Sequence, residues 1–151
     1  MGAVITVARE PGWYLEGGVP DTIDGRFRML ATISALTMVR LDELGSAGER
    51  ESALLTERFV EMMETEHREL GLGDPTLGKR VRQLVGALGK RVGLWRDVAS
   101  GTSEWRAATV ESIYGGEPAP DALDFAMHRL QEFSARLKSA GIDELEQGKF
   151  D

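Results

Sequence analysis

The chain has 151 residues, of which 42% are hydrophobic and 28% are charged, and its net charge is −7. This length and composition are typical of one folded domain with a substantial core, and the negative charge argues against general binding to nucleic acid phosphates. Because there is no cysteine, disulfides and thiolate metal sites are excluded.

The spacing of the apolar residues is helical throughout, and no stretch alternates as a strand would. We expect a short helix over residues 3–10, which ends at Pro11. The first long helix is expected over residues 22–44, with Asp21 as its N-cap and Asp24 in its first turn. Because this helix is apolar on nearly all sides, it is predicted to lie at the centre of the fold.

A glycine-containing loop over residues 45–48 is expected to separate the central helix from a second helix over residues 52–70. Gly71 then suits a left-handed helix ending, with an apolar Leu72 after it. The sequence thus predicts a tight turn between the second and third long helices.

Asp74 and Pro75 are the expected N-cap and first residue of the third helix, which continues to about Val98. Two further helices are expected over residues 104–114 and 121–140. The prediction is therefore an all-α single-domain bundle of about five helices around a central apolar helix. It divides into a helical domain over residues 1–142 and a flexible C-terminal tail over residues 143–151.

Residues 18–27 have the sequence Gly-Val-Pro-Asp-Thr-Ile-Asp-Gly-Arg-Phe. The start of a helix needs one capping side chain and one acid, but this segment contains turn formers, two carboxylates and an arginine. Asp24 and Arg26 have two interpretations. They could form an ion pair that fixes how the chain enters the central helix, or they could line a polar groove that recognises a partner.

The third helix carries Lys79, Arg82 and Lys90 on the side opposite its apolar stripe, together with Gly86 and Gly93. Each interior glycine costs roughly 1 kcal/mol of helix stability relative to alanine, so several on one face need a reason. The missing side chains could let a partner backbone or an anionic group approach the cations. Alternatively, they could admit another helix of the same domain.

A metal site is the sharpest alternative to a binding surface. Glu64 and His67 have the Glu-x-x-His spacing of di-iron bundles, which places both on one helical face. Those sites need the pattern twice, but Phe125 stands where a second glutamate would accompany His128. We therefore favour a solvated helix face with no cofactor, and a metal or redox protein using Glu64 and His67 is the alternative.

Several segments, in this order, resemble the ubiquinol–cytochrome c chaperone family, and together they cover about residues 8–98. They are 8–11 with Trp13-Tyr14, 18–27, 55–59, 68–74 and Gly78-Lys79. The resemblance implies a non-enzymatic helical chaperone that holds newly made cytochrome b and supports assembly of the bc1 complex. Mitochondrial relatives are associated with the ribosomal exit region and a small partner protein.

We expect a cytoplasmic protein, compatible with a peripheral position at the inner face of a membrane, because no stretch is long and apolar enough to cross a bilayer. Besides cytochrome b, the basic helix could meet the ribosome or anionic lipid, without sequence-specific nucleic-acid binding. A regulatory protein-binding module is a further alternative. The expected partner-binding residues are Asp21, Thr22, Asp24, Arg26, Arg68, Asp74, Lys79, Arg82 and Lys90.

Overall fold

The computed structural model describes residues 1–71 and 73–149, and every regular element in this part of the chain is a helix. The predicted all-α single-domain fold is confirmed, with seven α-helices where about five were expected. In chain order the elements are α1 (Gly2–Ala8), the 3-10 helix η1 (Pro11–Trp13), α2 (Ile23–Asp42), α3 (Gly45–Glu69), α4 (Asp74–Ala99), α5 (Trp105–Ile113), α6 (Pro120–Ser139) and α7 (Ile142–Glu146).

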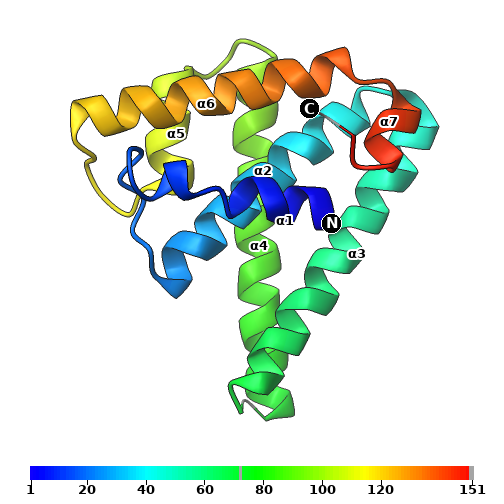
Figure 1. Ribbon diagram of the computed structural model, residues 1–151. Coiled ribbons are helices and arrows are strands. Elements are labelled where there is room, and N and C mark those ends of the chain that lie inside the picture. The colour runs from blue at the N-terminus through cyan, green and yellow to red at the C-terminus, as the bar shows by residue number, and fades with distance from the viewer. Residues whose placement is uncertain (72, 150–151) are drawn as a thin grey trace.

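Helix α2 lies at the centre, as its sequence predicts, and it contacts α1, α3, α4, α5 and α6 (Figure 1). Its small and apolar side chains, among them Met29, Ala31 and Ile33, are fully buried. The buried hydroxyl groups of Thr32 and Thr37 each donate to a main-chain carbonyl one turn earlier in the same helix, so both side chains are hydrogen-bonded within α2. The centre of the bundle therefore tolerates polar residues as well as apolar ones.

The start of α2 differs from the prediction by one residue. Thr22, not Asp21, is the N-cap, and its side-chain oxygen accepts from the backbone N–H of Gly25 at 3.0 Å. Thr22 forms the cap because its side-chain oxygen lies within hydrogen-bond distance of that N–H. Asp21, one residue earlier, instead forms an ion pair with Arg26. Asp24 lies in the first turn of the helix, as expected.

The loop predicted at residues 45–48 is wrong, because these residues form the first turn of α3. Gly45, the first residue of α3, has a φ of +81°, a left-handed conformation that glycine adopts without strain, so the chain turns there after only two residues, Glu43 and Leu44, between α2 and α3. Gly48 then packs so tightly that a Cβ there would lie 1.9 Å from the carbonyl oxygen of Leu41 in α2. The glycines therefore make a close helix–helix junction, and the polar residues of this segment misled the prediction.

At the other end of α3, Gly71 has the predicted left-handed conformation, with a φ of +84°. Leu72, expected to complete this turn, lies outside the described residues. Helix α4 begins with Gly73 as N-cap, and the predicted capping role of Asp74 is wrong. Asp74 occupies the first turn with Pro75, where a carboxylate still interacts favourably with the helix dipole.

Beyond α6, the residues expected to fray begin with the short helix α7, and its Leu145 is buried. The backbone N–H of Lys149 also donates to the carbonyl oxygen of Glu144 at 2.7 Å. The first part of the predicted tail thus has regular structure, anchored by an apolar contact. The division into a domain over 1–142 and a flexible tail over 143–151 stays a prediction.

The second half of α3 and the first half of α4 run side by side away from the body, and they end together at the tip near residue 71 (Figure 1). The other helices gather around the opposite ends of this pair, with α6 crossing the top in this view. None of the helices in the described ranges has the length and apolar character needed to span a bilayer.

Candidate functional site

A groove of about 870 Å³ opens beside the first half of α2, between α1 on one side and α3 and α4 on the other. Its floor is formed by apolar side chains from three helices: Phe27 and Leu30 of α2, Met62 of α3 and Leu84 of α4. Because these residues come from elements far apart in the sequence, only the fold brings them together. We call this feature the central groove.

The rim of the central groove carries two of the most exposed large apolar side chains of the described residues. Leu15, in the loop after η1, and Ile23, the first residue of α2, each have 76% of their surface exposed. Single exposed apolar residues are common, but two of them beside an apolar concavity form a patch of the kind used for binding. Neither residue is among the partner-binding residues expected from the sequence, which are all polar.

The charged residues on the rim form two ion pairs, and neither of them joins Asp24 to Arg26. Arg26 Nε donates to Asp21 Oδ1 at 2.8 Å, and this hydrogen bond raises the pKa of Arg26. Asp24 instead accepts from Arg28 Nε at 2.8 Å, so of the two interpretations of Asp24 and Arg26 the one that pairs them with each other is wrong. One helical turn separates Asp24 from Arg28, which brings their side chains together, whereas Asp24 and Arg26 project in different directions.

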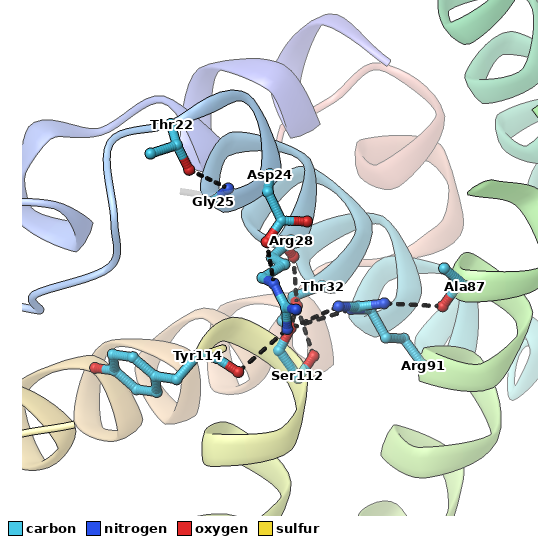
Figure 2. A network of polar contacts seen from close by, with 9 residues as sticks. All are labelled: Thr22, Asp24, Gly25, Arg28, Thr32, Ala87, Arg91, Ser112 and Tyr114. Carbon is cyan, nitrogen blue, oxygen red and sulfur yellow. Dashed lines mark hydrogen bonds and ion pairs between the residues drawn. The ribbon is translucent and has the colours of Figure 1, made fainter. Parts of the chain in front are cut away.

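Behind the rim, two arginines tie α5 to the central helices (Figure 2). Arg28 of α2 donates to the carbonyl oxygen of Tyr114 at 3.1 Å. Arg91 of α4 donates through Nε and Nη2 to the carbonyl oxygen of Ser112, at 3.1 and 3.0 Å. The Ser112 hydroxyl in turn lies 2.6 Å from that of Thr32. Burial lowers the pKa of Arg91, and the positive charge of Arg28 lowers it further.

This arginine network satisfies carbonyl groups at the end of α5 that the helix cannot pair within itself. The guanidinium of Arg91 also lies 5.9 Å from the centre of the Phe27 ring, and Phe27 lines the central groove. The network therefore supports the groove floor from behind. Neither Arg28 nor Arg91 is among the site residues expected from the sequence.

A second surface runs along α4, where Lys79, Arg82 and Lys90 are exposed as the helical spacing predicts. A Cβ added at Gly86, at Gly89 or at Gly93 would meet no atom within 4 Å. These glycines therefore do not admit another helix of the same domain, and that alternative is wrong for Gly86 and Gly93. We call this exposed surface the α4 face.

The two remaining predicted site residues lie near the tip of the α3–α4 pair, with Arg68 in the last turn of α3 and Asp74 in the first turn of α4. The structure thus places the nine predicted residues in three groups. Asp21, Asp24 and Arg26 line the central groove, whereas Thr22 caps α2 just beside it. The others follow the α3–α4 pair and do not line the groove.

The metal alternative gains no support from the described part of the chain, where no three potential ligands lie together. Glu64 and His67 share α3, but only His67 lines the central groove. His67 Nδ1 lies 2.7 Å from the carbonyl oxygen of Met63, one turn earlier. Its ring is therefore held against its own helix.

A family model described as ubiquinol-cytochrome C chaperone matches residues 15–115, about two thirds of the chain. The chain belongs to the ubiquinol–cytochrome c chaperone family. The match spans α2 to α5, and with them the groove floor and the α4 face. It begins after α1, which supplies one wall of the groove.

A solved structure agrees with this family assignment. The Cbp3 homolog from Brucella abortus is similar with a TM-score of 0.80 and 25% sequence identity. The similarity covers 97% of this chain and 82% of that chain, so it extends well beyond the residues of the family match. Among curated protein sequences, none matches significantly.

Proposed function

We propose that this member of the ubiquinol–cytochrome c chaperone family is a non-enzymatic assembly chaperone that holds newly made cytochrome b. It binds its client without covalent chemistry while the bc1 complex is assembled, in the cytoplasm at the inner face of the membrane. The central groove carries this proposal, because a floor of Phe27, Leu30, Met62 and Leu84 offers apolar surface to a client that has not yet buried its own. Methionine adapts its shape to different apolar partners, which suits a transient contact.

Site-specific crosslinking in cells that make cytochrome b tests the proposal. A photoreactive residue at Ile23, on the groove rim, is expected to crosslink to cytochrome b. The matched control is Glu132, which is exposed on α6 and does not line the groove. Equal yields of the cytochrome b adduct at both positions, or none at either, would show that the groove does not hold this client.

The same cells separate the two alternative functions. A regulatory module for another process is not expected to retain cytochrome b when the chaperone is purified, whereas an assembly chaperone is. Stoichiometric iron or manganese in the purified protein would instead favour the metal or redox alternative at Glu64 and His67.

The α4 face is proposed as a second contact surface, for the ribosome or for anionic lipid. Its three exposed cations stand out in a protein whose net charge is −7. Its open glycines leave space beside them, so an anionic group can approach closely. Arg68 and Asp74 near the tip extend this polar surface.

We expect the triple variant Lys79→Glu, Arg82→Glu and Lys90→Glu to fold normally but to support less bc1 assembly. All three side chains are exposed and none forms an ion pair within the described residues, so their reversal removes little internal stabilisation. The measurement is the steady-state level of cytochrome b, with thermal unfolding of the purified variant as the control for folding. A normal cytochrome b level would contradict an electrostatic contact at the α4 face.

A further inference from the structure

The walls of the central groove are mainly helical, and this limits the conformation of a segment that binds there. The backbone N–H and C=O groups within α1, α3 and α4 are paired inside their own helices, so these walls offer no edge to an added strand. An extended segment on the apolar floor would leave its own backbone groups unpaired, at a cost for each one. A helix satisfies its backbone internally and can present one apolar face to the floor.

Unpaired charges on the rim limit the polar face of that segment. Arg9, after α1, and Arg80, in α4, both line the groove, and within the described residues neither has a carboxylate at ion-pair distance. Arg80 makes only a long contact, at 3.5 Å, with its neighbour Gln83. The carboxylates of Asp21 and Asp24 are already engaged by Arg26 and Arg28.

Glu66 of α3 is the remaining carboxylate on the rim, and no ion pair engages it within the described residues. Because Asp24 is paired with Arg28 from outside the groove, the unpaired charges are two arginines and one glutamate, an excess of one positive charge. This excess is opposite in sign to the net charge of the whole chain. A bound segment is complementary in charge to this rim when carboxylates on its flanks lie close to Arg9 and Arg80.

We propose that the central groove binds an amphipathic helix whose apolar face covers the floor and whose flanking carboxylates pair with Arg9 and Arg80. This inference rests on the proposed function, because it specifies the chemistry of the client segment held in the groove. Leu15 and Ile23 on the rim extend the apolar contact beyond the floor. Arg9 approaches from the α1 side and Arg80 from α4, so the two cations meet carboxylates at different positions along the bound helix.

Two synthetic helical peptides of about 18 residues provide the test, since this length forms roughly five turns. Both carry the same leucine and phenylalanine face, but one has glutamates and the other lysines on its flanks. Fluorescence anisotropy at low salt is expected to show the glutamate peptide binding roughly three- to tenfold more tightly, as two exposed ion pairs predict. The net charge of −7 favours the lysine peptide at long range, so this order reports the local rim.

The double variant Arg9→Glu and Arg80→Glu is expected to abolish or reverse the preference. Its matched control, Arg50→Glu and Lys138→Glu, makes the same change of charge at exposed positions outside the groove and is expected to retain the preference. Ile23→Ser is expected to weaken both peptides alike, because it removes apolar contact at the rim.

Equal affinity for the two peptides, tighter binding of the lysine peptide, or no binding of either would overturn this inference. Crosslinking of cytochrome b at Ile23 tests the proposed function separately. If cytochrome b crosslinks at Ile23 but neither peptide binds, the proposed function stands. The proposal of a helical occupant with carboxylates on its flanks is then wrong.

Discussion

The substitution Gly48→Ala is expected to lower the free energy of unfolding by about 2–3 kcal/mol, a large effect for one methyl group. The added Cβ would lie 1.9 Å from the carbonyl oxygen of Leu41 and 3.0 Å from the Cβ of Leu44. Because the first of these atoms belongs to the α2 backbone, no rotation of a side chain relieves the clash, and the junction between α2 and α3 must open. At roughly 2–4 °C per kcal/mol, the midpoint of thermal unfolding should fall by about 5–10 °C.

Gly86→Ala is the matched control, and its effect is expected to have the opposite sign. Gly86 is an exposed interior residue of α4, and a Cβ there meets nothing within 4 Å. The substitution therefore gains about 0.5–1 kcal/mol from helix propensity alone. If Gly48→Ala left the midpoint of thermal unfolding unchanged or raised it as Gly86→Ala is expected to do, the tight junction at Gly48 would not exist as described.

These two glycines also show what the sequence can and cannot predict about the fold. The helical spacing of apolar residues was enough to predict α2 as the central helix, because that pattern reflects burial directly. The segment at residues 45–48 was predicted as a loop because glycine and serine favour turns. In the structure the same residues begin α3. Gly48 fits beside Leu41 of α2 only because it has no Cβ, so here glycine serves helix packing and not a turn. Close backbone contact between helices leaves no periodic signal in the sequence.

Much of the unusual chemistry over residues 18–27 has a structural explanation. Gly18 has a φ of +64°, Thr22 caps α2, and a Cβ at Gly25 would lie 1.8 Å from the carbonyl oxygen of Pro20. These residues hold a tight entry into α2. That entry places Ile23 and Arg26 on the rim of the central groove.

The candidate site could be predicted only in part, for a physical reason. Charged residues on one exposed helix face follow from spacing, and the exposure of Lys79, Arg82 and Lys90 agrees with it. The central groove is formed by residues that lie far apart in the sequence. No single one of them indicates a binding site when it is considered alone. The apolar residue Ile23, between Thr22 and Asp24, was the available signal, whereas Leu15 follows Trp13 and Tyr14 and does not stand out from its neighbours.

The second large expected effect concerns the half-buried arginine network of Arg28 and Arg91. Arg91→Ala should lower the free energy of unfolding by about 2–3 kcal/mol, because it removes charge-assisted hydrogen bonds from a poorly solvated site. The variant loses both contacts from Arg91 to the carbonyl oxygen of Ser112 and a third, at 3.1 Å, to that of Ala87. The Ser112 carbonyl would retain only the long contact of 3.4 Å from the Thr32 hydroxyl. Denaturant unfolding measures the loss.

Arg96→Ala is the matched control on the same helix, since Arg96 is 60% exposed and forms one ion pair, at 3.5 Å, with Asp42. It should cost less than about 1 kcal/mol. Similar stability losses in the two variants would mean that the network around Ser112 contributes no more than an ordinary surface pair.

Loss of Arg91 is also expected to change the central groove. A contact that only stabilises the fold would not have this effect. The guanidinium of Arg91 lies against Phe27, so its removal frees a ring that forms the groove floor. Hydrogen exchange should then quicken in α5, whose final carbonyls lose their donors, and crosslinking of the client at Ile23 should fall. Arg91→Lys sharpens the test, because a single ammonium keeps the charge but cannot form the paired hydrogen bonds of a guanidinium. Full recovery of crosslinking with lysine would assign the effect to charge alone, whereas continued loss would assign it to the forked hydrogen bonds that hold α5 beside the groove.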